Sequence, residues 1–426
     1  MCVKIKRPNG ILYFVVYILF FPVLKLMFRL KIDRKDYIRP EGPFLVVSNH
    51  STFMDFLLVM LAFYPRRMNA VTAQKFFIYR PLNWLLPIMG CIPKNLFDPD
   101  IRAIKCIKTV LKRKGAILLF PEGRCSTDGV YAGIHKSTGK LVKNLGVPVM
   151  SCHVEGGYIC MPFWRKGLRP GRVRLTLASL FTAEDTKTLS VDEINGAIDA
   201  RLAGCDTCPP LKPFGTFRTR RLTEGLHTIL YWCPDCGSEF TLETKGNTIR
   251  CGACGISAVM EAGARLLSLG DKSHRLRPGF PSSVHMWFRE QVRYEMKNLS
   301  GDMDPIVERV AVRIPAPEAG GGMRHGGNGI LRLTPQGWYY DGEISGESVS
   351  MFFPIDTVPA IPVDPEDDFQ IYSNGSFFMF TPEDARKCIK YSILGECAYW
   401  RFATRCQMTP GWDSGFSTAE TAQVEN

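Results

Sequence analysis

The feature that most constrains the fold is the alternation of short apolar runs and amphipathic stretches between residues 40 and 210. Strands are predicted at 44–48, 116–120, 147–152 and 173–177, and helices at 53–63, 101–114, 137–145 and 191–202. Uninterrupted apolar runs such as FLVVS and AILLF are typical of strands that are buried on both faces, as in a parallel sheet. Residues 36–210 are therefore predicted to form an α/β domain in which helices cover a mainly parallel sheet.

Polar segments follow two of these strands directly: NHSTFMD after the first and PEGRCSTDG after the second. Because the carboxyl ends of parallel strands lie at one edge of a sheet, the two segments should meet there. His50 and Asp55 are five residues apart, which is about 140° on a regular helix, so they can meet only if His50 lies in the loop before the helix. Asp55 could then accept the Nδ1 proton of His50 and leave Nε2 as a general base.

These motifs resemble those of the glycerolipid acyltransferase family that includes 1-acylglycerol-3-phosphate (lysophosphatidate) acyltransferase. His-x4-Asp is matched by His50 and Asp55, Phe-Pro-Glu-Gly by residues 120–123, and a valine-proline-valine strand motif by residues 147–149. Each motif alone is weak, but three of them in order, over roughly residues 30–205, make the resemblance specific.

The resemblance implies an enzyme that transfers an acyl group from acyl-CoA or an acyl carrier protein to the hydroxyl of a lysophospholipid. The first candidate acceptor is 1-acylglycerol-3-phosphate, which would give phosphatidate. The implied roles are catalysis by His50 and Asp55 and phosphate or headgroup binding by four residues: Lys94, Glu122, Gly123 and Arg124. No acyl-enzyme intermediate is expected, because a thioester is already activated.

Two departures from the family pattern leave the acceptor open. The family usually has Thr-Arg after Phe-Pro-Glu-Gly, whereas this chain has Arg124 and then Cys125. The family's second motif ends in an arginine that binds the acceptor phosphate, whereas residues 90–95 offer only Lys94. A lysine is a point charge and cannot bind a phosphate through two parallel hydrogen bonds, as an arginine can. The alternative function is a catalytically silent membrane-bound adaptor that binds a partner through the zinc ribbon and the C-terminal module described below.

Residues 1–35 are predicted to associate with a membrane at its cytoplasmic face. Residues 11–24 carry no charge, and residues 1–40 contain nine Lys/Arg against two Asp/Glu, a net charge of +7. Because Lys25 and Arg29 follow too soon for about twenty apolar residues, we expect a helix or hairpin that lies in one leaflet and binds anionic lipid headgroups. A single membrane span and a buried core helix are the alternatives.

Two Cys-x2-Cys-Gly knuckles, separated by fourteen residues, predict a zinc ribbon at residues 228–262. The four predicted ligands are Cys233, Cys236, Cys251 and Cys254. The zinc is expected to be structural, because four thiolates leave no open coordination position, and no nucleic-acid partner is expected. An odd total of fifteen cysteines fits a reducing compartment, so we interpret the further pair, Cys205 and Cys208, as incidental.

The rest of the chain is predicted to form a linker at 211–227, an α+β module at 263–406 and a disordered tail at 407–426. The module is expected to contain helices at 287–298 and 383–402, a glycine-rich loop at 319–329, and strands at 306–314, 330–333, 338–340, 349–353, 369–372 and 377–380. Several short strands before one long helix resemble the pleckstrin-homology type. Eight acids and no base at 341–368 argue against binding of anionic headgroups by this module.

Overall fold

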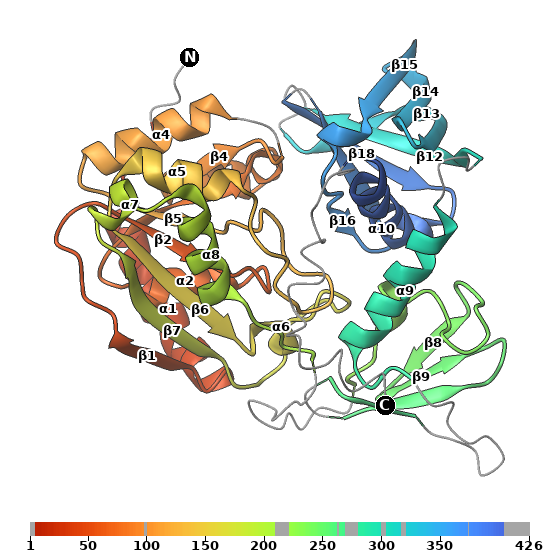
Figure 1. Cartoon of the computed structure of the whole chain (residues 1–426), viewed down its shortest axis with the longest axis horizontal. Helices are drawn as coiled ribbons and strands as arrows, with labels where there is room; N and C mark the ends of the chain where they lie inside the picture. The colour runs from red at the N-terminus through yellow and green to blue at the C-terminus, as the bar shows by residue number, and fades with distance from the viewer. Residues whose placement is uncertain are drawn as a thin grey trace.

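The computed structural model describes residues 5–97, 100–208, 221–261, 264–268, 280–299, 304–316, 321–373 and 375–403. These residues form three sheets, with the first sheet and its helices on one side of the molecule and the other two sheets opposite (Figure 1). The predicted linker is described only from residue 221 onward, and the predicted tail lies outside the described residues.

The first sheet has seven strands in the order β1-β7-β6-β2-β5-β3-β4. All neighbouring pairs are parallel except β6 and β7, so the prediction of a mainly parallel sheet is confirmed. The strands are β1 (Lys31–Asp36), β2 (Phe44–Ser48), β3 (Met68–Ala73), β4 (Ile92–Lys94), β5 (Ala116–Leu119), β6 (Val149–Glu155) and β7 (Arg174–Phe181). Of these, β1, β3 and β4 were not predicted from the sequence.

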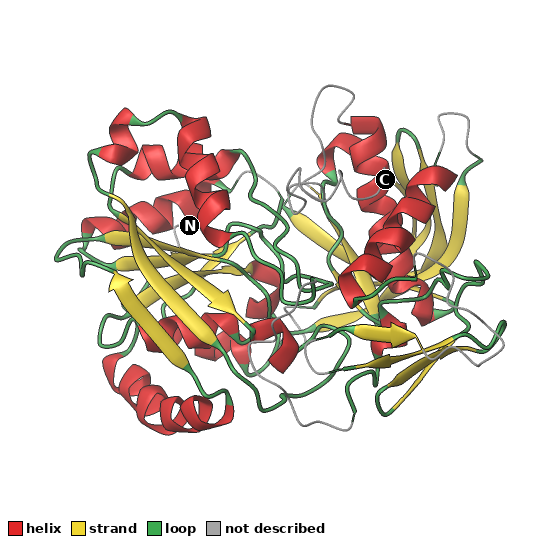
Figure 2. Cartoon of the chain, turned by 60° about the horizontal axis from the view of Figure 1, so that its bottom comes forward, coloured by secondary structure: helices red, strands yellow, loops and turns green. Residues whose placement is uncertain are grey.

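Helices cover both faces of this sheet, as Figure 2 shows. One face packs against α4 (Ile101–Lys112), α5 (Ser137–Leu145) and α8 (Val191–Leu202), and the other against α1 (Gly10–Met27), α2 (Asp55–Ala62) and α3 (Leu82–Ile88). Two short helices, α6 (Gly157–Cys160) and α7 (Asp185–Thr188), complete the domain. In β2, Phe44 and Val46 enter one core while Leu45 and Val47 enter the other, which explains the unbroken apolar run.

The second sheet is a small antiparallel one in the order β11-β10-β9-β8. Its strands are β8 (Leu242–Lys245), β9 (Thr248–Cys251), β10 (Ser257–Met260) and β11 (Leu266–Ser268). A third sheet follows α9 (Val284–Asn298), in the order β15-β14-β13-β12-β18-β17-β16, and each neighbouring pair is antiparallel.

The strands of this third sheet are β12 (Ile306–Pro315), β13 (Met323–Thr334), β14 (Gly337–Ile344), β15 (Glu347–Pro354), β16 (Val363–Asp364), β17 (Asp368–Ser373) and β18 (Ser376–Pro382). The buried helix α10 (Cys388–Ala398) packs beside β16 and β17. The prediction of an α+β module is confirmed, while its likeness to the pleckstrin-homology type stays a prediction.

The prediction of a glycine-rich loop at 319–329 is wrong from Met323 onward, because β13 begins there and runs through the glycines. A Cβ atom on Gly329 would lie 2.6 Å from the carbonyl oxygen of Asp341, and one on Gly327 would overlap that of Glu343. Glycine is therefore needed here for the close approach of β14 and does not mark a turn.

Candidate active site

The polar loops after β2 and β5 meet at the carboxyl edge of the first sheet, as the sequence predicts. In register, Val47 of β2 lies beside Leu119 of β5, and Ser48 lies beside Cys152 of β6. The loops are joined directly, because the backbone N–H of Ser126 donates to the carbonyl of His50 over 2.9 Å.

His50 lies in the loop before α2, and Asp55 is the first residue of that helix. Nδ1 of His50 is 3.5 Å from Oδ2 of Asp55. The carboxylate is completely buried and accepts two hydrogen bonds from Thr52, one from its backbone N–H (2.7 Å) and one from its hydroxyl (3.0 Å). The Phe120 ring stacks on the imidazole at 4.2 Å between ring centres. The predicted pair is therefore together in space, with both members held by neighbours.

Glu122 joins the two loops through their backbones. Its Oε1 accepts from the N–H of His50 over 2.6 Å, and its Oε2 accepts from the N–H of Ala132 over 2.9 Å. Burial raises the pKa of Glu122 to about 7, against the opposing effect of these two hydrogen bonds. Gly123 follows with a φ of +75°, which permits the turn. In this structure Glu122 holds the site's loops in place, and its contact with substrate stays a prediction.

Cys125 was not identified as a site residue from the sequence. Its Sγ lies 3.4 Å from Nε2 and 3.7 Å from Nδ1 of His50. Burial alone would lower the pKa of His50, but the interactions with Cys125 and with Asp55 outweigh it and raise the pKa of His50 well above its ordinary value. The only signal in the sequence was the departure from the Thr-Arg pattern at this position.

The predicted phosphate-binding bases are already engaged by protein groups. Nη2 of Arg124 donates to Oε2 of Glu396 over 2.9 Å, and Nη1 donates to the other oxygen of the same carboxylate. Lys94 donates to the carbonyl of Asn95 over 2.8 Å. The sequence could not reveal the partner of Arg124, because Glu396 lies 272 residues further along the chain.

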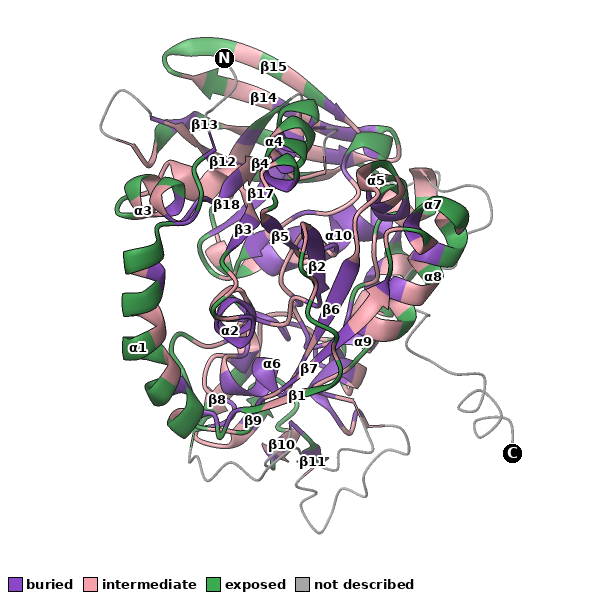
Figure 3. Cartoon of the chain, turned by 90° about the vertical axis from the view of Figure 1, so that its left-hand side faces the viewer, coloured by how far each residue is buried: buried purple, intermediate pink, exposed green. Residues whose placement is uncertain are grey.

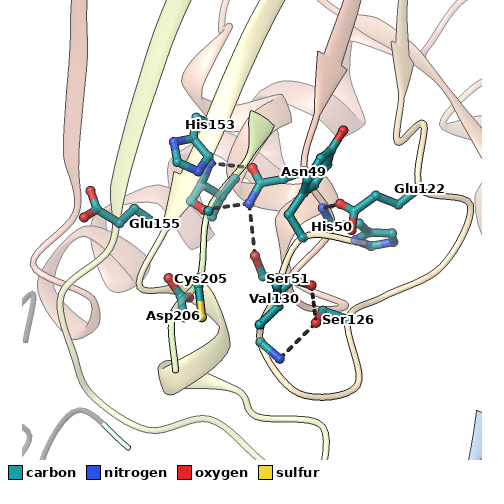
Figure 4. A pocket seen from close by; sticks show the side chains of 14 residues that line it. Asn49, His50, Ser51, Glu122, Ser126, Val130, His153, Glu155, Cys205 and Asp206 are labelled. Carbon is teal, nitrogen blue, oxygen red and sulfur yellow. Dashed lines mark hydrogen bonds between the residues drawn. The ribbon is translucent and has the colours of Figure 1, made fainter. Parts of the chain in front are cut away.

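A cavity of about 100 Å³ lies beside His50 (Figure 4). Its walls also include Glu122, Ser126, Tyr131, His153 and Asp206. Burial lowers the pKa of His153 to about 4, and burial raises the pKa of Asp206 to about 7 although Asp206 accepts two backbone N–H groups.

Cys205 also lines this cavity and forms a disulfide with Cys208. Our interpretation of this pair as incidental is therefore wrong. Residues 204–206 pack against the loop after β5, where the N–H of Tyr131 donates to the carbonyl of Gly204 and the N–H of Asp206 donates to the carbonyl of Gly129.

The four cysteines of the predicted ribbon converge, with all their Sγ atoms within 4.8 Å of one another. The Cys233–Cys254 and Cys236–Cys251 sulfur pairs are each 3.8 Å apart, which is about the edge of a tetrahedron with zinc–sulfur bonds of about 2.3 Å. The knuckles close as expected, since the N–H of Gly237 donates to the carbonyl of Cys233 over 2.9 Å. The donor set and its spacing therefore fit a zinc ion.

Comparisons with known proteins match two parts of the chain. A family model described as Acyltransferase matches residues 29–155, and one described as DNA directed RNA polymerase, 7 kDa subunit, a zinc ribbon, matches residues 227–262. The chloroplastic 1-acyl-sn-glycerol-3-phosphate acyltransferases BAT2 of Brassica napus and LPAT1 of Arabidopsis thaliana are each 27% identical over 141 residues.

These matches cover 32% of this chain and 40% and 39% of the two relatives, so the chain spans about two fifths of the length of the curated relatives it matches. A crystal structure of the 1-acyl-sn-glycerophosphate acyltransferase PlsC from Thermotoga maritima aligns at 21% identity with a TM-score of 0.39, over 45% of this chain and 76% of that one. Residues 29–155 thus resemble an acyltransferase domain, and residues 227–262 resemble a zinc ribbon.

Proposed function

We propose that the protein transfers an acyl group from an acyl thioester to the free hydroxyl of a lysophospholipid, with 1-acylglycerol-3-phosphate as the acceptor. The observation that carries the proposal is the pairing of His50 with the buried Asp55 beside a cavity, in a domain of this family. The relatives named above act on the same acceptor by their names. Acyl-CoA and an acyl carrier protein both remain candidate donors.

The chemistry follows from the residue types. Nε2 of His50 takes the proton from the acceptor hydroxyl as its oxygen attacks the thioester carbonyl. The tetrahedral intermediate then collapses with cleavage of the carbon–sulfur bond, and the leaving thiolate receives a proton from His50. Asp55, fixed by Thr52, holds the Nδ1–H tautomer and stabilises the imidazolium that forms.

The test is a screen of lysolipid acceptors with one labelled acyl thioester and the purified chain. Acylation of 1-acylglycerol-3-phosphate in preference to other lysolipids supports the proposal. Failure to acylate any acceptor would favour the adaptor function instead.

The helix α1 supports association with a lipid surface, which is the second part of the proposal. It is 18 residues long, about 27 Å, and it is long and apolar enough to cross a membrane by length and composition alone. A single membrane span therefore stays the alternative for this helix. One side of the helix packs on the domain through Tyr13 and Leu24, and the other side is exposed (Figure 3).

The exposed side carries a row of large apolar side chains: Ile11, Phe14, Val15, Ile18, Leu19, Phe20, Val23 and Leu26. A helix that is half packed on its own domain and half apolar toward the outside suits a position in one leaflet, parallel to the membrane surface. An acceptor that stays in the bilayer would then reach the site without leaving the lipid phase. The cytoplasmic face is part of the same proposal.

Charging this exposed side should release the protein from membranes. The double variant Ile18→Glu/Leu19→Glu is expected to lose most vesicle binding, by about tenfold or more, because two apolar side chains would no longer enter the lipid. Flotation with anionic phosphatidylglycerol vesicles measures the effect. Val307→Glu, an exposed valine of β12, is the matched control and should float like the wild type. Equal flotation of the double variant would contradict the leaflet-bound position of α1.

The pH dependence should report the thiol beside His50. Only neutral His50 can accept a proton, so activity should rise with pH and level off above the pKa of His50. Because that pKa is raised, the rising limb should lie above the range of an ordinary histidine. Cys125→Ser removes one cause of the rise, so its rising limb should move to lower pH with a similar plateau. Profiles of kcat/KM against pH measure this, and an unchanged or upward-shifted limb would contradict it.

A further inference from the structure

An ion pair joins the loop after β5 to the last helix of the chain. Arg124 and Glu396 make two parallel hydrogen bonds through both terminal nitrogens and both carboxylate oxygens. The side chains are only 19% and 5% exposed. Two parallel hydrogen bonds between buried side chains fix the orientation of the guanidinium, because rotating it would break one of them.

Glu396 is the more firmly held partner. It lies on α10, where every residue from Cys388 to Ala398 other than Lys390 is buried, and its Oε1 also accepts from the backbone N–H of Ile361 over 3.3 Å. Arg124, by contrast, lies on a loop. The position of the carboxylate is therefore set by the C-terminal module, and the arginine takes its orientation from it.

The same loop is held a second time four residues further on. Oδ2 of Asp128 is 2.6 Å from Nδ1 of His285, a residue of α9, and both side chains are 8% exposed. Both contacts therefore come from helices that pack against each other, α9 and α10.

The interface around the ion pair indicates that the pair does not separate each time a substrate binds. Three side chains of β17 and β18 (Tyr372, Phe377 and Met379) pack against four from the first domain (Ile78, Tyr79, Leu96 and Phe97). Nζ of Lys75 also donates to Oε1 of Gln370 over 3.0 Å. Separating these surfaces would expose apolar area and buried polar groups at every turnover, so the pair is a lasting part of the site.

Two further carboxylates near Arg124 could attract its guanidinium away from the position set by Glu396. Glu122 and Asp128 also attract its guanidinium, although more weakly than Glu396. Without Glu396 the guanidinium would move toward these carboxylates, and Glu122 is the group that holds the backbone of His50. With Glu396 in place, two of the five guanidinium N–H groups are engaged by its carboxylate.

We infer that Glu396 is a positioning residue, which holds Arg124 in the orientation that binds the acceptor's phosphate. Recognition of the headgroup is then a joint property of the acyltransferase domain and the C-terminal module. This inference rests on the proposed function.

The test compares the wild type with Glu396→Gln, Arg124→Ala and the double variant in initial-rate assays. Glu396→Gln should raise the KM for 1-acylglycerol-3-phosphate about tenfold or more, because the charge-assisted contact that orients Arg124 is lost, with little change in kcat and none in the KM for the acyl thioester. The double variant should be no worse than Arg124→Ala, since Glu396 acts only through Arg124. Glu396→Asp keeps the charge and should recover part of the affinity.

Glu308→Gln is the matched control. Glu308 is a buried acid of the same module whose hydrogen-bond partners are Lys387 and Tyr391, and not Arg124, so its loss should lower the melting temperature and leave the acceptor KM unchanged. Where Glu396→Gln melts without a cooperative transition, the comparison uses Glu396→Asp, for which a smaller rise in the acceptor KM is expected.

Three outcomes would overturn the inference: a lower acceptor KM in Glu396→Gln, which would make Glu396 a competitor of the phosphate; an unchanged KM; or additive losses in the double variant. A wild-type chain that acylates no acceptor would instead overturn the proposed function. Calorimetric titration with glycerol 3-phosphate would then decide the role of Glu396, with weaker binding to Glu396→Gln expected.

Discussion

His50→Ala is expected to reduce acyl transfer by about a hundredfold to ten-thousandfold, the usual contribution of a positioned general base. Without the imidazole no group is placed to take the proton from the acceptor hydroxyl, so kcat should fall. Release of radiolabelled phosphatidate from a labelled acyl thioester and 1-acylglycerol-3-phosphate measures the effect. The imidazole stacks on Phe120 and lies beside Asp55 and Cys125, so the melting temperature should fall modestly while the chain stays folded.

His135→Ala is the control for this substitution. His135 is exposed and bonds to its neighbour Ser137, so its removal should leave the rate unchanged. Asp55→Asn should also lower kcat, because an amide can donate to Nδ1 and favour the wrong tautomer. A His50→Ala variant with more than a tenth of the wild-type rate would remove His50 as the base.

Cys236→Ser should abolish stoichiometric zinc binding and unfold the ribbon. Structural zinc contributes about 10–16 kcal/mol of folding free energy in small zinc-binding peptides. Loss of one of the four thiolates should therefore unfold a sheet of such short strands. Metal analysis should find about one zinc per wild-type chain and much less in the variant. Limited proteolysis should show new cleavage between residues 227 and 262.

The consequences should reach the active site. Gln291 of α9 accepts the N–H groups of Tyr231 and Trp232, and Trp287 donates to the carbonyl of Trp232 over 2.8 Å. The ribbon therefore helps to place α9, whose His285 holds Asp128 beside the site. Loss of zinc should lower acyl transfer as well as stability. Cys106→Ser, a cysteine outside the cluster, should keep its zinc, and retained zinc in Cys236→Ser would contradict the ribbon.

Local patterns in the sequence predicted much of the first domain. The predicted bounds of β2, α5 and α8 agree with the structure, because a doubly buried strand, an amphipathic helix and a helix stop at Gly146 each depend on neighbouring residues alone. The same reasoning placed His50 in a loop and Asp55 at the start of a helix, since five residues cannot otherwise bring them together. The two cysteine knuckles are likewise local, because each pair of cysteines is separated by only two residues.

Features formed by segments far apart in the sequence could not be predicted from local patterns. The strand β13 runs through glycines that locally indicate a loop, and only the approach of β14 shows why they are there. β4 has three residues, too few for a periodic pattern, and forms because β3 lies beside it.

The sequence by itself determined the acyltransferase motifs, the pairing of His50 with Asp55 and the set of four cysteines, because each rests on short-range geometry. Only the tertiary structure decided what surrounds them: Cys125 against the imidazole, the disulfide of Cys205 and Cys208 in the cavity wall, and Glu396 on Arg124. The physical reason is that these contacts depend on how sheets, helices and their connecting loops pack together, and the residue types at the two ends of a contact do not encode that packing.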